Sequence, residues 1–458
     1  MVYYGALSKG CEQCRRRKIK CDERKPSCLK CESSNRSCPG YRDLTAISFR
    51  DESARVIRKT RQRGASASYG RTITCNPSPC TEDLAAGFFF SMYNIYNGPY
   101  FSMVSRDWLC EIYVNDPTCD VLRAAIEAVG MAGLSNTSYA PHLAVQAQAR
   151  YGKALSALDG ALQDPCVATR DTTLMTVILL GLFELVSTDA ADESGYWIAH
   201  AAGALALLQL RGPDQFARPR GGQLYVFTRS QILSACMTQK LPVPPAIVST
   251  TYDFETSTLR QLWKASGYAT PGSISEICFR LVNLRALIAH DGLVDPIFIR
   301  EHAFAIDADL EEWKASAQIR WAYETISAPN TSRSAFMEKH HHYANLWVAT
   351  AWLNYRLLRI LVNKLIIENE LKLEYADEIL SRAREIVKHL STEICISVGS
   401  FDGTPHILSV IQPLSVVAEE SLNPVAVRSF AVEQLYRIQY SMGVRQAGRL
   451  ADIASLLL

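Results

Sequence analysis

Six cysteines near the N-terminus restrict the fold more than any other feature of the chain. They form two copies of the pattern Cys-x2-Cys-x6-Cys, and the second copy lies seventeen residues after the first: Cys11, Cys14, Cys21, Cys28, Cys31 and Cys38. Two separate tetrahedral zinc sites need four ligands each, so six thiolates can serve two ions only if two sulfurs are shared. The spacing therefore predicts a binuclear Zn2Cys6 cluster that holds two Zn2+ per chain.

Disulfides are the alternative that also suits a short, cysteine-rich segment. Fewer than roughly 40 residues rarely bury enough apolar surface to fold alone, so the segment needs either a metal or covalent cross-links. The N-terminal sequence MVYYGALSKG lacks the charged start, apolar stretch and cleavage site of a secretory signal. We therefore expect a reducing compartment, which favours thiolate ligands over disulfides.

The interval between the second and third cysteines is strongly basic. Five of its six residues are cationic, namely Arg15, Arg16, Arg17, Lys18 and Lys20, whereas the matching interval of the second copy contains only Arg36. A short helix starting near Cys11 would carry these cations into the major groove of DNA, where Arg and Lys donate to guanine O6 and N7. Two alternatives stay open: a solvated basic run or nuclear import signal, and charge that merely neutralises the thiolates of the cluster.

The cysteine-rich segment resembles the fungal Zn2Cys6 binuclear-cluster transcription factors through these residues: Gly10–Asp22, Pro26, Cys28, Cys31, Cys38, Gly40 and Tyr41. The resemblance implies that Cys11 and Cys28 bridge the two zinc ions. It also implies that the other ligands complete one site each in pairs, Cys14 with Cys21 and Cys31 with Cys38.

The same resemblance assigns roles to the basic residues. Family members typically read a CGG triplet through the end of the first helix, a position occupied here by Arg17 and Lys18. Arg15, Arg16 and Lys20 would then mainly contact phosphate. Pro26 lies in the loop between the halves, where the family places a turn proline that is sometimes cis.

Charge is distributed unevenly along the chain. Residues 1–71 contain 18 Lys or Arg and 7 Asp or Glu, a net charge of +11. Because all 458 residues together carry +2, the remainder carries −9. A basic head on an acidic body suits a nucleic-acid-binding module joined to a domain that does not itself attract polyanions, and it favours a nuclear location.

These patterns divide the chain into a Zn2Cys6 DNA-binding domain over 8–42, a basic linker over 43–80 and an all-helical regulatory domain over 81–458. The linker ends in the small-residue, Gly- and Pro-containing stretch GASASYGRTITCNPSPC, which is typical of a flexible connection. Its first part offers only a partial heptad, so a homodimer through the linker is weakly supported.

From Thr81 onward the hydrophobic pattern is helical, with hardly any strand-like alternation. Besides a helix that starts at Thr81, the sequence predicts helices over Cys119–Leu134, Leu143–Leu162, Thr172–Val186, Gly195–Leu210, Ile274–His290, Ile299–Trp313, His342–Ile367 and Ala376–Ile394. The apolar run Leu174–Phe183 is well short of the roughly 20 residues that cross a bilayer. We expect it to be a buried core helix, in a large all-α domain with no membrane partner.

Two segments of the body, Tyr196–Gly212 and Leu346–Ile360, resemble more loosely the regulatory domain that follows such zinc clusters. In the family this region senses small molecules, controls activation or self-associates. The resemblance therefore allows a homodimer and a small-molecule effector as partners.

Catalysis has no positive support in the sequence. His200 on an apolar helix is more often a packed histidine than a base, and the run His340–His342 lacks the i, i+4 pairing of a helical zinc site. Most of the eight cysteines outside the cluster are expected to be buried apolar residues. P-loop, dinucleotide, HExxH and GxSxG patterns are absent.

The leading hypothesis is therefore a sequence-specific DNA-binding regulator of RNA polymerase II transcription, which acts in the nucleus with the transcription machinery and is not an enzyme. A small-molecule-binding or protein-interaction scaffold with a zinc-stapled head is the second hypothesis, and an enzyme fused to a DNA-binding head is the third. The scaffold leaves the one-sided basic interval unexplained.

Overall fold

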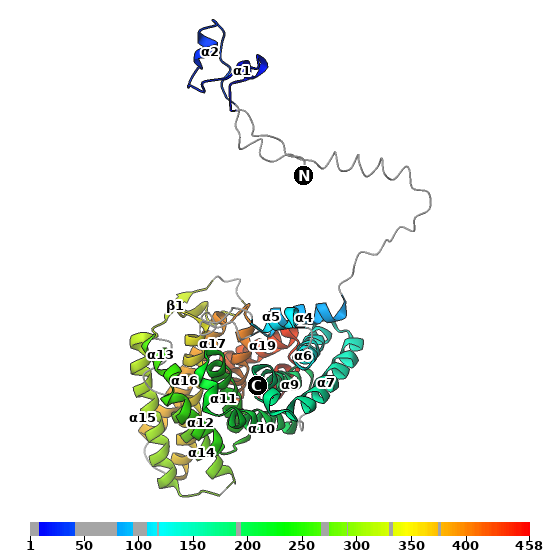
Figure 1. Cartoon of the computed structure of the whole chain (residues 1–458). Helices are drawn as coiled ribbons and strands as arrows, with labels where there is room; N and C mark the ends of the chain where they lie inside the picture. The colour runs from blue at the N-terminus through cyan, green and yellow to red at the C-terminus, as the bar shows by residue number, and fades with distance from the viewer. Residues whose placement is uncertain are drawn as a thin grey trace. The chain divides into compact units, whose positions relative to one another are not determined.

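The computed structural model describes residues 9–41, 80–94, 108–116, 119–188, 194–266, 274–290, 292–328, 333–373 and 377–458. The chain divides into two compact units, Met1–Ser78 and Pro79–Leu458 (Figure 1). The predicted linker over 43–80 and its partial heptad lie outside the described residues, apart from Cys80.

Two short helices repeat the same backbone turn in the N-terminal unit. α1 (Glu12–Arg16) and α2 (Leu29–Glu32) each follow a cysteine in extended conformation. Each helix is followed by a residue with positive φ, Lys18 after α1 and Asn35 after α2. In both turns this residue and its successor donate backbone hydrogen bonds of 2.9 to 3.1 Å to the helix: Lys18 to Arg15, Ile19 to Cys14, Asn35 to Glu32 and Arg36 to Cys31. Both helices thus close with a Schellman motif, and the sequence repeat is also a structural repeat.

The N-terminal unit has almost no hydrophobic core. Among residues 9–41, only Gly10 and four of the cysteines are buried. Cys21, Cys38 and Tyr41 are partly buried around those four. Since no large apolar side chain is buried in this segment, apolar burial alone cannot offset the entropy of ordering the chain.

The C-terminal unit is built from helices, and the large all-α domain expected from the sequence is confirmed. Its helices are α4 (Thr81–Met92), α5 (Trp108–Asn115), α6 (Asp120–Ser138), α7 (Pro141–Leu162), α8 (Pro165–Ala168), α9 (Asp171–Ser187), α10 (Ser194–Arg211), α11 (Pro219–Gln239), α12 (Pro245–Thr256), α13 (Thr258–Ala265), α14 (Ile274–His290), α15 (Pro296–Arg320), α16 (Leu346–Leu373), α17 (Asp377–Ser397), α18 (Ile411–Glu419), α19 (Val425–Met442) and α20 (Arg445–Ser455).

Local chemistry sets several helix ends in this unit. The Cys80 sulfur caps α4 by accepting a hydrogen bond from the Asp83 amide at 3.4 Å. Asp295 caps α15 by accepting from the Ile297 amide at 3.0 Å, and a proline follows it at the first helical position. α10 ends at Arg211, one residue beyond the predicted end at Leu210, and Gly212 adopts a φ of 59° before Pro213.

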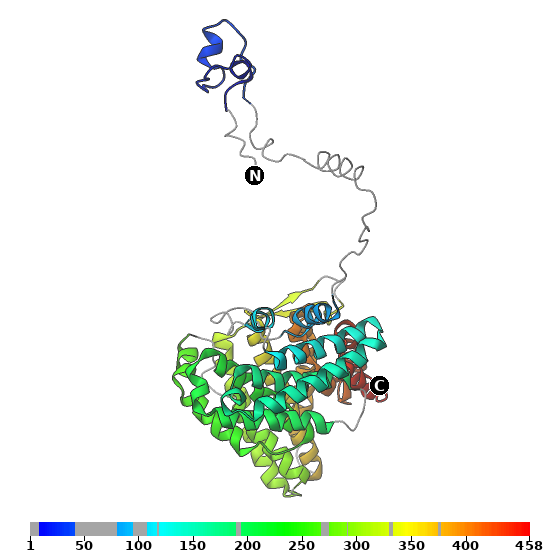
Figure 2. The ribbon, with the colours of Figure 1, turned by 45° about the vertical axis from the view of Figure 1, so that its right-hand side comes forward.

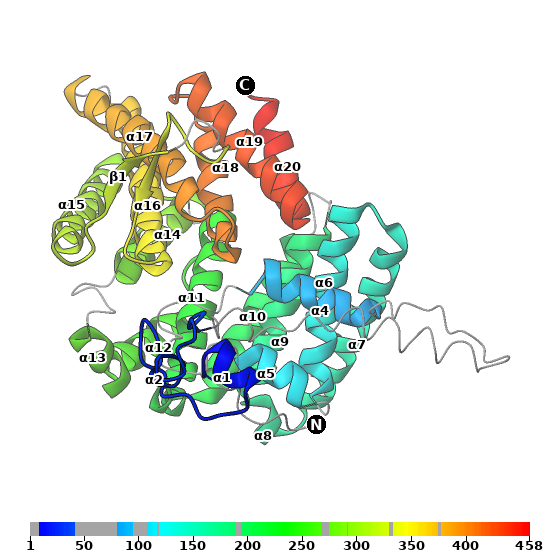
Figure 3. The ribbon, with the colours of Figure 1, turned by 90° about the horizontal axis from the view of Figure 1, so that it is seen from above.

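The last helices of the chain return to the first helices of the body. α6 and α7 run side by side, and α19 and α20 contact α6 and α9, respectively (Figures 2 and 3). Asn136 in α6 donates through Nδ2 to the Gly443 carbonyl at 2.7 Å. Gly443 has a φ of 73°, and a Cβ there would lie 2.5 Å from the Gly133 carbonyl oxygen, so this close approach requires glycine.

α9 is a core helix, as expected from its apolar run. Leu174, Leu179 and Leu180 are fully buried within it. In the part of the chain that the structure describes, no helix has the length and apolar character needed to cross a membrane.

A small hairpin replaces the start of one predicted helix. β1 (Glu324–Ser327) pairs antiparallel with β2 (Lys339–His342), and Glu324 lies opposite His342. α16 begins only at Leu346, so the prediction of a helix from His342 onward was wrong at its N-terminal end. The run His340–His342 therefore alternates across a strand instead of lying on successive faces of a helix.

Candidate metal centre and nucleic-acid interface

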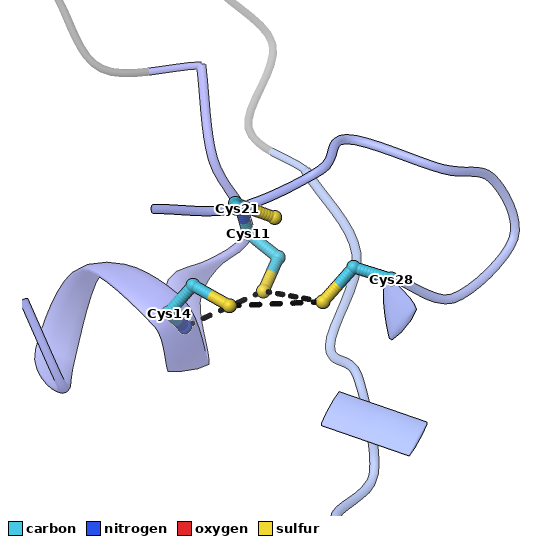
Figure 4. A group of neighbouring side chains, drawn as sticks. All are labelled: Cys11, Cys14, Cys21 and Cys28. Atoms are coloured by element: carbon cyan, nitrogen blue, oxygen red, sulfur yellow. Dashed lines mark hydrogen bonds between the residues drawn. The ribbon is translucent and has the colours of Figure 1, made fainter. Parts of the chain in front are cut away.

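The six cysteines lie together in two overlapping groups of four. The first group is Cys11, Cys14, Cys21 and Cys28, and the second is Cys11, Cys28, Cys31 and Cys38. Within each group all four sulfurs lie within 4.8 Å of one another. The first group brings the end of the basic interval and the start of α2 to the N-terminus of α1 (Figure 4). Two cysteines, Cys11 and Cys28, belong to both groups.

The spacing of the sulfurs fits tetrahedral zinc. With Zn–S bonds of about 2.3 Å, two ligands of one tetrahedron lie about 3.8 Å apart. The Cys11 and Cys28 sulfurs are 3.6 Å apart, and the Cys11–Cys31 and Cys14–Cys28 pairs are each 3.7 Å apart. The last two pairs are equivalent under the seventeen-residue repeat. The donor set is thus nearly symmetric about an axis between Cys11 and Cys28, and it fits two ions that share this pair.

Burial and backbone contacts shift the pKa values of the thiols in opposite directions. Loss of hydration, followed by neighbouring thiols, raises the pKa of Cys14 and raises that of Cys31 to about 12. The backbone N–H groups of Cys28 and Gly40 lower the pKa of Cys38 to about 7. Although loss of hydration raises it, backbone N–H donors bring the pKa of Cys21 down to about 7 as well. Zn2+ supplies the positive charge that lets such crowded sulfurs ionise together, because a coordinating thiol is deprotonated outright.

The predicted DNA-contacting cations are exposed on one continuous run after the first two cysteines. Arg16, Arg17, Lys18 and Lys20 are exposed, and Arg15 is half-buried. The expectation that one helix carries all five is wrong, because α1 ends at Arg16. Arg17 caps the helix, Lys18 adopts a φ of 54°, and Lys20 lies beyond the turn. The Schellman motif therefore fixes the direction in which the chain leaves α1.

The loop between the two halves is held by contacts that the sequence analysis did not single out. Asp22 accepts a hydrogen bond from the Leu29 amide at 3.2 Å, and this bond lowers the pKa of its carboxyl group. Tyr41 donates from its hydroxyl to the Arg24 carbonyl at 2.6 Å, and the Arg24 side chain forms an ion pair with Glu32. The Lys25–Pro26 peptide within this loop is cis. The repeated spacing of the cysteines gave no signal for these contacts, which depend on the folded loop.

The histidines of the body that the sequence argued against as bases or metal ligands are packed among polar partners. His200 lies with Nε2 3.1 Å from the Tyr151 hydroxyl, which also donates to Glu184 at 2.5 Å. His341 is buried, and its Nε2 lies 3.1 Å from the Glu393 carboxylate. Over the residues that the structure describes, the two cysteine groups are the only clusters of three or more side chains suited to a metal ion.

The other cysteines are less buried than expected. Three are buried, two are half-buried and two are exposed: Cys236, Cys278 and Cys395; Cys110 and Cys119; Cys80 and Cys166. Cys75 lies outside the described residues.

Both parts of the chain match known families. Residues 9–46 match the Fungal Zn(2)-Cys(6) binuclear cluster domain, and residues 91–453 match the Fungal specific transcription factor domain. Since these matches cover most of the sequence, the chain belongs to the fungal zinc-cluster transcription factors, whose cluster domain binds two zinc ions. The predicted family and its metal are thereby confirmed.

Individual relatives align over short segments. White-opaque regulator 2 of Candida albicans is 60% identical over 38 residues, which are 8% of each chain. Transcriptional regulatory protein moc3 of Schizosaccharomyces pombe is 60% identical over 37 residues, 8% of this chain and 7% of that protein. Transcriptional regulator dmxR14 of Cryptosporiopsis sp. is 31% identical over 132 residues, 25% of this chain and 30% of that protein. Each alignment thus spans less than a third of the relative's length, and no solved structure gives a significant match.

Proposed function

We propose that the protein is a sequence-specific DNA-binding regulator of genes transcribed by RNA polymerase II, and that it is not an enzyme. The observation that carries this proposal is the largely exposed run of cations between Cys14 and Cys21, two members of a cysteine cluster with zinc-binding geometry. The family to which the chain belongs, and relatives named as transcriptional regulators, support the same function.

The cluster has a structural role in this proposal. Cys11 and Cys28 bridge the two zinc ions, since their sulfurs belong to both groups. Each site is completed by a pair of cysteines, Cys14 with Cys21 and Cys31 with Cys38. Because residues 9–41 bury little besides sulfur, the binding energy of zinc is the folding energy of this head.

The basic interval contacts DNA in two ways. Arg17 and Lys18, which directly follow α1, contact the guanines of a CGG-type triplet, because their donors suit O6 and N7 in the major groove. The remaining cations of the interval, Arg15, Arg16 and Lys20, neutralise phosphates. Three such contacts predict that log K falls with log salt with a slope of about −3.

The remaining assignments extend this scheme to the whole chain. The DNA-binding domain occupies 8–42, the basic linker 43–80 and the regulatory domain 81–458. The protein acts in the nucleus, where the helical body meets the transcription machinery. A homodimer and a small-molecule effector stay predictions from the family resemblance.

Selection of preferred duplexes from a random pool by the zinc-loaded full chain tests the proposal. We expect enrichment of CGG-type triplets, and their spacing would report whether one chain or two are bound. Arg17→Ala should relax the preference at one base, whereas Arg36→Ala, which removes an exposed cation of the second repeat, should leave the preference intact. Binding to all duplexes alike, with no preference as salt rises, would instead favour the scaffold hypothesis.

A further inference from the structure

Arg17 and Ser34 occupy the same position in the two repeats, and they contact each other. Ser34 lies seventeen residues after Arg17, the spacing that relates the two halves. The Arg17 guanidinium donates from Nη1 to the Ser34 hydroxyl oxygen at 3.1 Å. Equivalent positions of two related halves meet only close to the axis between them, as Cys11 and Cys28 do. The Arg17–Ser34 contact is therefore a second junction of the halves, at the end of α1 rather than at the sulfurs.

Ser34 is itself fixed by the end of α2. Its hydroxyl lies 2.8 Å from the Lys30 carbonyl oxygen and 3.1 Å from that of Cys31, and it donates its hydrogen to this last turn. A hydroxyl has one donor and two acceptor lone pairs. With its hydrogen committed to α2, Ser34 presents a lone pair in a defined direction to Arg17.

The contact leaves the guanidinium able to bind a base. Arg has five N–H donors in a rigid fork, and the bond to Ser34 uses one of those on Nη1. The donors on Nε and Nη2 stay available for a bidentate contact with guanine O6 and N7. Within residues 9–41, Arg17 is the only one of the five predicted DNA-contacting cations with a hydrogen bond to another side chain.

We propose that Ser34 is a positioning residue, which holds the Arg17 side chain in place for base recognition. The inference rests on the proposed function, because Arg17 contacts a base only if the head reads DNA. A long side chain loses conformational freedom when it binds, and a side chain already held by a hydrogen bond loses less. The second repeat, which has a single cation in its matching interval, thus takes part in base recognition through a hydroxyl group.

Substitution of Ser34 in the zinc-loaded full chain tests this role, with affinity for the selected duplex and for a random duplex measured by fluorescence anisotropy. Ser34→Ala should weaken binding to the selected duplex about threefold to tenfold and binding to random DNA less than about twofold. Ser33→Ala, at the exposed neighbouring serine, is the matched control and should change neither. In an Arg17→Ala background, Ser34→Ala should have no further effect, because the two residues act as one unit.

A second pair of variants separates the hydroxyl from the shape of the side chain. Ser34→Thr keeps a hydroxyl and should keep the preference for the selected duplex. Ser34→Val has the shape of the threonine side chain without its hydroxyl and should lose this preference. This pair replaces the alanine variant if Ser34→Ala holds fewer than two zinc ions. The role of Ser34 would be overturned by equal losses of affinity for both duplexes, by additive effects with Arg17→Ala, or by a valine variant with full preference. None of these three results would affect the proposed function. A wild-type chain without any preferred duplex would instead remove the proposed function itself.

Discussion

Replacing a cysteine shared by both groups should release more zinc per chain than replacing a cysteine that belongs to one group. Cys28 belongs to both cysteine groups, and its sulfur lies 3.6 Å from that of Cys11 and 3.7 Å from that of Cys14. Cys38 belongs to one group only. Cys28→Ala therefore leaves three thiolates for each ion, whereas Cys38→Ala leaves the four sulfurs of the first group intact.

The energetic scale of this difference follows from what the head buries. A structural zinc ion contributes about 10 to 16 kcal/mol in small zinc-dependent folds. Little apolar burial is present in residues 9–41 to replace it, since the buried residues are Gly10 and four cysteines. We expect Cys28→Ala to lose both ions and to unfold the head, and Cys38→Ala to keep about one ion per chain.

Zinc per chain, measured by elemental analysis after dialysis under reducing conditions, decides between these outcomes. Cys166→Ala is the matched control, because this exposed cysteine lies outside the cluster and its loss should leave two ions. Cys28 would not be a shared ligand if the Cys28→Ala chain still held two zinc ions, or if the Cys28 and Cys38 variants lost the same amount of zinc.

Three further predictions concern the turn after α1, the polar core and the helix packing. Lys18→Ala should weaken binding to the selected duplex by about 1 to 3 kcal/mol, with zinc content unchanged, and equal losses on random DNA would make Lys18 a phosphate contact. Desolvation raises the pKa of Glu393, but hydrogen bonds and charge from His341 and Arg356 outweigh it and lower this pKa from 4.5 to about 2. The contribution of the Glu393 carboxylate to the free energy of unfolding is therefore present above pH 4.5 and is lost as the pH falls towards 2. Glu393→Gln should therefore lower the free energy of unfolding at pH 7 by on the order of 3 kcal/mol and flatten its dependence on pH between these values, which chemical denaturation at several pH values would measure. Gly130→Ala should lower the melting temperature, because its Cβ would lie 1.9 Å from a backbone oxygen of α4, whereas Gly152→Ala meets open space and should not.

The cysteine cluster could be predicted from the sequence because its information is local. The spacing alone predicted a cluster of six thiolates in which two are shared. The structure brings all six sulfurs into two groups with Cys11 and Cys28 in common. The Schellman turn was not predicted, because Lys18 carries no preference for a positive φ that would mark it. The Arg17–Ser34 contact was also missed, although the seventeen-residue repeat contained the signal for it.

In the body, a continuous apolar run located α9 and the helical hydrophobic pattern located α14, whose bounds were predicted without error. The segment from α11 to α13 was missed: the first turn of α11 contains Gly221 and Gly222, and α13 spans only 8 residues, so neither gives a sustained pattern. In the β1–β2 hairpin, the buried His341 contacts Glu393, a residue far along the chain. Periodicity cannot report such a contact.

In the proposed function, two zinc ions shape the head that recognises DNA. The most direct test is to remove zinc from the full chain with a chelator, follow its affinity for the selected duplex, and then restore the metal. We expect the preference for this duplex to disappear with the zinc and to return when two ions per chain are bound again. A chain stripped of zinc that still distinguished the selected duplex from random DNA would show that the metal does not shape the DNA-binding head.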